Sequence, residues 1–325
     1  MCRIMQNLRN ISFNSKILVA VLFVIITLIS ITGFYLNSFL NKINYLETQP
    51  IKDFNTDNNN IIPIGNDKEK DEDDPFANKN IINILLIGTD MTSEEGTRSD
   101  SIIIATINKK GKTIKLTSLM RDLYVPIPGQ VDNRINAAYT LGGMDLLKKT
   151  VEENFSIEIE GCVEVDFLGF ISAIDIIGGV DIELNKAEAY YLSNSSGLSF
   201  TEGANNLTGE TALAYSRIRY IGNADYERTE RQRNVLTAAF DKLKDSGIKT
   251  LLELANDVLP FITTNLTPSQ IFTMVTNVIL MDISNIESYR IPADGEFIET
   301  TIRDMAVLLP NIPENSRLLK EYIGY

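Results

Sequence analysis

The chain has 325 residues, a formal net charge of −13 and a hydrophobic content of 44%. This length is enough for one large domain or two small ones with a substantial core. The acidic balance argues against nucleic acid as a partner, because the phosphate backbone repels a negatively charged protein. The absence of histidine excludes Ser-His-Asp and Cys-His triads and removes the commonest zinc ligand.

The segment Ile17–Leu36 carries no charged side chain. As a helix it would span roughly 30 Å, the thickness of the hydrocarbon core of a bilayer. Residues 1–16 contain basic but no acidic side chains, which predicts that they lie in the cytoplasm and that everything after Leu36 lies outside. A cleaved signal peptide is the alternative. It would have a shorter apolar region and a small-residue cleavage site, which does not follow Phe34-Tyr35-Leu36. We therefore expect a single-pass membrane anchor.

Residues 37–80 contain the polar stretches NTDNNN and DKEKDEDD. Such a composition cannot bury enough apolar surface to fold, so this segment is predicted to be a disordered linker. From Ile81 the composition is that of a folded chain, with no internal repeat and no second linker. The sequence thus predicts a single extracytoplasmic domain over residues 81–325.

Apolar or alternating runs bounded by turn residues predict the first strands of this domain at Ile81–Ile87, Ser101–Ile107 and Thr113–Leu119. A tight turn at Lys109–Lys112 joins the last two. Further strands are predicted at Ile157–Asp166, Val180–Leu184 and Ile286–Ile291. Helices are predicted at Ala137–Phe155, Phe167–Ile177, Thr208–Tyr215, Tyr226–Lys244, from Thr267-Pro268 onwards, and at Ile298–Leu309. Leu192–Asn206 is predicted to be a surface loop. Interleaved strands and helices indicate an α/β (α+β mixed) fold, with a central mixed sheet covered by helices.

Arginines are clustered in this acidic domain, and three groups stand out. They are Arg98 with Arg121 and Arg134; Arg217 with Arg219; and Arg228 with Arg231 and Arg233. The planar guanidinium group matches phosphate oxygens, so the clusters favour a polyphosphate pocket over exposed salt bridges. For Arg233 an exposed salt bridge is the preferred interpretation. The spacing of Arg217-Ile218-Arg219 is that of a strand, which would direct both guanidinium groups to one side.

Two aspartates lie at predicted strand ends. Asp90 follows a buried strand, and Asp100 precedes the next. A single aspartate in such a turn is usually a backbone cap. The pair, with arginine beside it, instead predicts a site for Mg²⁺ or Mn²⁺, which prefer oxygen ligands and leave coordination positions to a substrate phosphate.

The stretch DYERTERQ (Asp225–Gln232) is expected to open a helix, on which Arg228 and Gln232 share a face. One side chain would hold phosphate and the other would donate to a neighbouring group. A charged outer face of the helix is the alternative.

Taken together, these segments resemble the LytR-CpsA-Psr family of cell-wall glycopolymer transferases. The matching motifs occur in the family's order: NILLIGTD (Asn83–Asp90), RSDSI (Arg98–Ile102), SLMRD (Ser118–Asp122), RINAAYTLGG (Arg134–Gly143), VEVDFLGF (Val163–Phe170), GGVDIEL (Gly178–Leu184), LTGETALAYSRIR (Leu207–Arg219) and ERTERQ (Glu227–Gln232). Each motif alone is weak, whereas all of them in order are highly specific.

The resemblance implies a phosphotransferase that moves a glycopolymer phosphate from a polyprenyl-pyrophosphate carrier to a muramic acid hydroxyl of peptidoglycan. It implies that Asp90 and Asp100 bind the metal. The positions that match the pyrophosphate contacts are Arg98, Arg121, Arg217, Arg219, Arg228 and Gln232, with Arg231 in the same motif. The expected catalytic set is Asp90, Asp100, Arg98, Arg121 and Asp122.

Two residues depart from the family pattern. Glu227 stands where a small residue, usually glycine, precedes the motif arginine, and Arg134 stands where lysine is more usual. The first change bears on local loop geometry, whereas the second preserves the charge.

Phosphoryl transfer in line needs positioning and charge neutralisation more than a covalent nucleophile. Without histidine, a carboxylate must accept the proton of the attacking hydroxyl, and Asp90 and Asp122 are both candidates. Apolar helices such as Phe167–Ile177 would line a groove for the polyprenyl tail, although burial in the core is their ordinary role. Two other functions are compatible with these residues: a non-catalytic wall regulator that binds polyprenyl phosphates, and a pyrophosphatase or hydrolase of the same lipid.

Overall fold

A computed structural model describes residues 38, 40–46, 79–90, 98–219, 221, 225–244, 246–281, 283 and 285–325. The chain divides into two compact units, Met1–Lys42 and Ile43–Tyr325. The predicted cytoplasmic segment 1–16 and the predicted anchor Ile17–Leu36 lie outside the described residues. Within the described ranges, no helix has both the length and the apolar character needed to cross a membrane.

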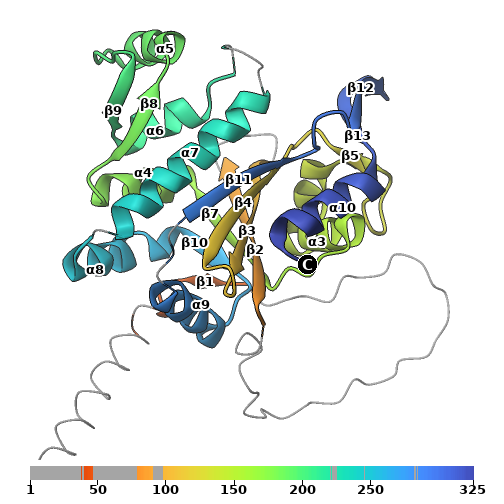
Figure 1. Cartoon of the computed structure of the whole chain (residues 1–325), viewed down its shortest axis with the longest axis horizontal. Coiled ribbons are helices and arrows are strands. Elements are labelled where there is room, and N and C mark those ends of the chain that lie inside the picture. Colours follow the sequence, from red (N-terminus) through yellow and green to blue (C-terminus); the bar gives the residue numbers. More distant parts are fainter. Residues whose placement is uncertain are drawn as a thin grey trace, which may run out of the picture. The chain divides into compact units, whose positions relative to one another are not determined.

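A mixed sheet forms the centre of the second unit (Figure 1), and the described residues contribute seven strands to it in the order β1-β10-β7-β2-β3-β4-β11. These strands are β1 (Asn44–Tyr45), β2 (Ile81–Asp90), β3 (Arg98–Asn108), β4 (Thr113–Leu119), β7 (Gly161–Asp166), β10 (Ile262–Thr264) and β11 (Asn285–Ile291). The pairing is parallel between β2 and β7 and between β4 and β11, whereas β3 is antiparallel to both β2 and β4.

In the described part of the chain, three two-stranded ribbons lie outside this sheet: β5 (Tyr124–Val125) with β6 (Asn133–Arg134), β8 (Val180–Leu184) with β9 (Gly203–Leu207), and β12 (Phe297–Ile302) with β13 (Met305–Pro310). The helices that the structure describes from Ile43 onwards are α3 (Ile135–Phe155), α4 (Phe167–Ile176), α5 (Lys186–Ser196), α6 (Gly209–Ser216), α7 (Asp225–Lys244), α8 (Ile248–Asp257), α9 (Pro268–Leu280) and α10 (Ile312–Ile323), with a short 3₁₀ turn, η2, at Leu259–Phe261. The predicted mixed sheet with covering helices is confirmed.

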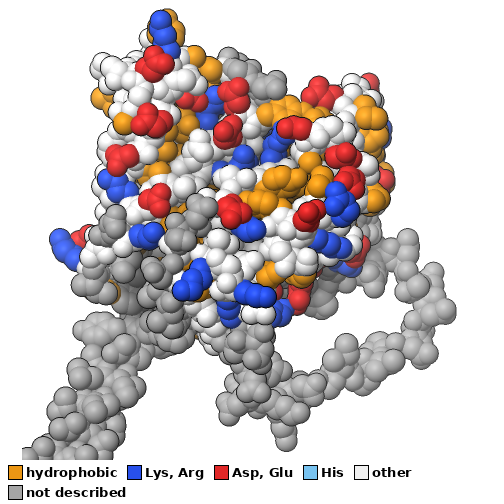
Figure 2. Space-filling view, viewed as in Figure 1, with side chains coloured by type: hydrophobic (Ala, Val, Ile, Leu, Met, Phe, Trp, Pro, Cys, Tyr) orange, Lys and Arg blue, Asp and Glu red, His pale blue; other side chains and the backbone are white. Residues whose placement is uncertain are grey.

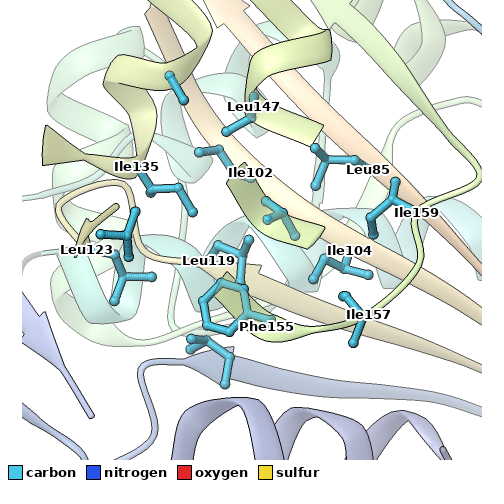
Figure 3. Close-up of a cluster of buried hydrophobic side chains, with 14 of the residues drawn as sticks. Leu85, Ile102, Ile104, Leu119, Leu123, Ile135, Leu147, Phe155, Ile157 and Ile159 are labelled. Carbon is cyan, nitrogen blue, oxygen red and sulfur yellow. The ribbon is translucent and has the colours of Figure 1, made fainter. Parts of the chain in front are cut away.

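Alternation along the strands gives the sheet two apolar faces. Leu85 and Ile87 of β2 belong to one buried cluster with residues of α3 and α10, shown in Figure 3. Ile82 and Ile84 of the same strand belong to a second cluster, which includes side chains of α7 and α9. Figure 1 shows α3 and α10 together on one side of the sheet and α7 on the other. A third buried cluster joins α4, α5, α6 and α7 with the β8–β9 ribbon.

The strand pairing brings several chain segments to one edge of the sheet. Since β3 is antiparallel to both of its neighbours, β2 and β4 run in the same direction, as do their parallel partners β7 and β11. The carboxyl ends of these four strands therefore share one edge, at which β3 begins. The motif residues at the end of β2, at the start of β3 and just after β4 lie at this edge, which is the usual place for ligands in such sheets.

Several sequence predictions differ from the structure. The predicted linker extends too far at its start, because Ile43 is buried and β1 pairs with β10. The predicted loop Leu192–Asn206 contains the end of α5 and most of β9. The predicted helix Ile298–Leu309 is the β12–β13 hairpin. The strand predicted from Ile157 begins only at Gly161.

Candidate functional site

The first part of the site is formed by the ends of β2 and β3. Asp90 and Arg98 are cross-strand partners at the last position of the β2–β3 pairing. A register shift between Gly88 and Thr89 leaves Asp100 without a partner residue on β2, which is the pattern of a β-bulge. The backbones that carry the two predicted metal-binding aspartates are thus close together. The side chains of Asp90, Arg98 and Asp100 lie outside the described part of the structure.

Asp122, just beyond the end of β4, lies between two guanidinium groups. Its Oδ2 atom is 3.4 Å from Nε of Arg121, and its Oδ1 atom is 3.4 Å from Nη1 of Arg134. Arg134 is the residue that precedes α3. The departure from lysine at this position therefore keeps a positive charge next to Asp122.

Asp225, the first residue of α7, contacts three guanidinium groups, one of which is that of Arg121. Its Oδ1 atom is 3.2 Å from Nη1 of Arg228 and 3.9 Å from Nε of Arg219, and its Oδ2 atom is 3.4 Å from Nη2 of Arg121. Arg228 is buried, whereas Arg219 is 40% exposed. We call Arg121, Arg134, Arg219 and Arg228, together with Asp122 and Asp225, the arginine cluster.

The two carboxyl groups of the arginine cluster have opposite pKa shifts. Burial raises the pKa of Asp122 above its ordinary value, as does its hydrogen bond with Asp225, against the opposing effect of Arg121 and Arg134. Burial acts on Asp225 in the same sense, but Arg228, Arg121 and Arg219 outweigh it and lower the pKa of Asp225. These opposite shifts favour the proton on Asp122 and the negative charge on Asp225.

Two more predicted residues border the arginine cluster. The guanidinium carbon of Arg217 lies 4.6 Å from the centre of the Phe167 ring, at the start of α4. Gln232 accepts a hydrogen bond of 3.1 Å from Ser101, the residue after Asp100. The strand predicted at Arg217-Ile218-Arg219 is wrong. Arg217 is the C-cap residue that follows α6 and has right-handed helical backbone angles, and Ile218 is buried.

Arg231 occupies a different environment from its neighbour Arg228. Its side chain is buried and donates to Glu188, to Glu227 and to the carbonyl oxygen of Ile218. These contacts join α7 to α5 and to the segment after α6. All three guanidinium nitrogens of Arg231 are used within the protein, so the structure does not place it among the groups of the arginine cluster.

Arg233 differs from the exposed salt bridge predicted for it. Its side chain is buried, and its Nη1 atom donates to the hydroxyl of Ser118 at 2.7 Å. Burial lowers its pKa to about 10. Arg233 is not an exposed salt bridge because the side of α7 that carries it faces β4.

Helix α4 begins beside Arg217 and is unusually apolar for its exposure. Within it only Gly169 and Ile174 are buried, whereas Leu168 is 65% exposed. Phe167 and Ile171 are partly exposed. An incompletely covered apolar helix therefore begins beside Arg217, which lies two residues before Arg219 of the arginine cluster.

Asp225 is the residue that the sequence analysis missed. An acidic residue in the first turn of a helix, three positions before an arginine, is a signal for such a pairing. The pairing with Arg121 joins positions 104 apart in the chain, and no local pattern indicates it.

An acidic mixed-sheet domain with clustered guanidinium groups at the carboxyl edge of its sheet is the type of protein that this fold and site define. The profile of the LytR_cpsA_psr family matches residues 47–320. The chain belongs to this family, as the motifs predict.

Three similar proteins illustrate the relationship. The polyisoprenyl-teichoic acid--peptidoglycan teichoic acid transferase TagU of Bacillus mycoides is 34% identical over 238 residues, covering 72% of this chain and 76% of TagU. The regulatory protein MsrR of Staphylococcus aureus is 30% identical over 253 residues, covering 77% and 76% of the two chains. The LytR-CPS2A-psr family protein YwtF (TagT) with bound octaprenyl pyrophosphate lipid has a TM-score of 0.60 and 26% identity, covering 79% of this chain and 95% of that chain.

Proposed function

We propose that the chain is a membrane-anchored phosphotransferase of the cell wall. It moves a glycopolymer phosphate from a polyprenyl-pyrophosphate carrier to a muramic acid hydroxyl of peptidoglycan. In this proposal residues 1–16 are cytoplasmic, residues 17–36 are the anchor, and the domain from residue 81 onwards works on the outer side of the membrane. The names of TagU and of the lipid-bound TagT structure support this choice of carrier and acceptor.

The observation that carries the proposal is the convergence of Arg121, Arg219 and Arg228 on the single carboxylate of Asp225. Guanidinium groups held in fixed positions bind the oxygens of a diphosphate without first having to be ordered. In a domain with net negative charge, such a group of arginines indicates one specific anionic ligand rather than general attraction to anions.

The reaction forms one bond and breaks one. The muramic acid oxygen attacks the phosphorus next to the glycopolymer, and the bond from that phosphorus to the oxygen bridging to the carrier's other phosphate breaks. Polyprenyl phosphate leaves, and the hydroxyl proton passes to a carboxylate. Asp122 suits this role because its raised pKa makes it a better base than an ordinary aspartate. Asp90 is the other candidate.

The placement of Asp90 and Asp100 on adjacent strand ends fits a hard divalent cation, since both supply carboxylate oxygens. When bound there, Mg²⁺ or Mn²⁺ would neutralise charge on the diphosphate and on the leaving phosphate. Arg98, the cross-strand partner of Asp90, would hold the diphosphate from the side of the β2–β3 strand ends.

The polyprenyl tail needs an apolar surface that begins at the diphosphate. Helix α4 meets this need, because Phe167 at its start contacts Arg217 and its apolar residues are incompletely covered. Arg217 would then contact the head group while the tail lies along α4.

The experiment uses the whole chain in detergent, a labelled lipid-linked glycopolymer and uncross-linked peptidoglycan strands. We expect transfer in the presence of Mg²⁺, and a loss of about 100-fold or more in Arg219→Ala. Arg317→Ala is the matched control, because this arginine is exposed and pairs with Glu314 and Glu321 of its own helix, α10. Full activity of Arg219→Ala or Asp100→Ala would contradict the proposal.

A second candidate is a non-catalytic regulator that holds polyprenyl phosphates, which the name of MsrR favours. It predicts lipid binding without turnover under any divalent cation. Release of free polymer in the absence of peptidoglycan would instead indicate a hydrolase.

A further inference from the structure

A cavity of about 470 Å³ begins at Tyr226, the residue after Asp225. The residues that line it are not members of the arginine cluster. It is bounded by the first turns of α7, the end of β11 and the start of β12. Tyr226, which follows Asp225 directly, forms part of its wall. Figure 2 shows basic and acidic side chains beside apolar ones on the face where α7 and β11 lie.

The aromatic part of the wall consists of Tyr226 and Phe297, whose ring centres are 6.0 Å apart. The hydroxyl of Tyr226 donates to Glu299 at 2.8 Å, and the guanidinium of Arg290 lies 4.5 Å from the centre of the Tyr226 ring. Rigid aromatic rings held beside hydrogen-bonding groups suit a ligand that has both apolar faces and many hydroxyls.

Arg233 is the buried polar residue of this cavity. Only 7% of its surface is exposed, and its Nε atom has no hydrogen-bond partner within the described residues. Its Nη1 atom donates to Ser118, three residues before Arg121. A buried guanidinium in the wall of a cavity favours a ligand with acceptor oxygens, because it places a positive charge at that wall.

The remaining charges select among possible ligands. The lining contains the carboxylates of Glu230, Asp294 and Glu299 against two guanidinium groups, and Arg290 is already paired with Asp294. A polymer with repeated phosphates would be repelled by three carboxylates. A neutral glycan would find acceptors for its hydroxyl and amide protons and donors for its oxygens.

We propose that this cavity, which we call the glycan pocket, binds a sugar of the peptidoglycan acceptor strand. This assignment rests on the proposed transfer to a muramic acid hydroxyl. The glycan pocket and the arginine cluster meet at Asp225 and Tyr226, so a strand seated in the pocket presents a neighbouring hydroxyl to the diphosphate.

The test is direct binding without any donor lipid, measured by calorimetric titration of the whole chain in detergent with uncross-linked peptidoglycan strands. We expect Phe297→Ala and Glu299→Gln each to weaken strand binding by about three- to tenfold. Farnesyl diphosphate binding should stay unchanged. The matched controls are Tyr190→Ala and Glu202→Gln. Both positions are exposed and distant in sequence from the residues that line the pocket.

Glu299 is exposed, so Glu299→Gln keeps the test valid if Phe297→Ala is unstable. Unchanged strand binding in both variants would overturn the assignment. A change confined to the binding of polyglycerol phosphate would also overturn it, because the pocket would then belong to the donor polymer. Strand binding that depends on the pocket in a protein without transferase activity would support the glycan pocket while refuting the proposed function.

Discussion

The Nε atom of Arg231 lies 2.7 Å from Oε1 of Glu188, and both side chains are buried. This pair joins the middle of α7 to the first turn of α5. The remaining donors of Arg231 reach Glu227 and the carbonyl oxygen of Ile218. Arg231 therefore holds α7 in the position that brings Asp225 and Arg228, in the first turn, to the edge of the sheet.

Replacing Arg231 with leucine should destabilise the protein strongly. The carboxylate of Glu188 would remain buried without its ion-pair partner, which typically costs about 3–5 kcal/mol. The free energy of unfolding of the whole chain in detergent, measured by urea titration, gives the comparison with the wild type.

Arg317→Leu is the matched control for this change, since its ion pairs on α10 are exposed and screened by solvent. The double variant Glu188→Gln/Arg231→Leu should recover part of the lost stability, because it removes the unpaired charge. Equal, small losses in Arg231→Leu and Arg317→Leu would refute the structural role of Arg231.

The contact between α4 and α6 depends on Gly209. A Cβ atom at this position would lie 2.3 Å from the carbonyl oxygen of Ile171, which is backbone and cannot move independently of α4. We expect Gly209→Ala to displace α4, to cost about 1–3 kcal/mol of stability and to weaken the binding of a polyprenyl diphosphate. Thermal unfolding and lipid titration measure the two effects.

Gly247→Ala controls for the loss of a glycine, because a Cβ atom there would meet nothing within 4 Å. It should lower stability by less than about 1 kcal/mol. If Gly209→Ala behaves like this control in both measurements, the close approach of α6 to α4 has no energetic importance.

The raised pKa of Asp122 predicts the pH dependence of transfer. A base must be deprotonated, and a raised pKa keeps Asp122 protonated at a higher pH than an ordinary aspartate. The rate should therefore fall as the pH drops through a value above the usual aspartate range near 4. This fall in rate at low pH, the acid limb of the pH profile, is measured from initial rates of transfer at saturating donor and acceptor.

Asp122→Asn should remove the acid limb and lower the rate by about 10²- to 10⁴-fold, while diphosphate binding persists. A variant that keeps both the rate and the limb would point to Asp90 as the base.

The sheet was predictable because its strands carry local signals. Thr113–Leu119 has the same bounds in the sequence prediction and in the structure, since an alternating run between a tight turn and a charged segment defines it. The β12–β13 hairpin was not predictable as such. Its two-residue turn is Arg303-Asp304, both with positive φ, where glycine or asparagine would be the usual signal. The apolar residues around that turn recur at a spacing that also suits a helix.

The site was predictable in composition but not in its pairing. Clustered arginines indicated phosphate, and Arg121, Arg219 and Arg228 do converge. The carboxylate on which they converge, Asp225, comes from a helix distant in sequence from β4. The same motif also contains Arg231, whose residue type alone does not distinguish a buried structural arginine from one that binds phosphate.

The last prediction concerns the divalent cation. If Asp90 and Asp100 hold Mg²⁺ or Mn²⁺, a chelator should abolish transfer and added Mg²⁺ should restore it, because the arginines alone leave part of the diphosphate charge uncompensated. Asp100→Asn should reproduce the effect of the chelator, since an amide oxygen binds the cation more weakly than a carboxylate. Electron paramagnetic resonance of Mn²⁺ supplies a measurement that is independent of turnover, and Asp100→Asn should weaken Mn²⁺ binding while the exposed control Asp257→Asn leaves it intact. Transfer that proceeds fully in the presence of a chelator, with wild-type Mn²⁺ binding in Asp100→Asn, would leave the two aspartates a role in shaping the β2–β3 edge but none as metal ligands.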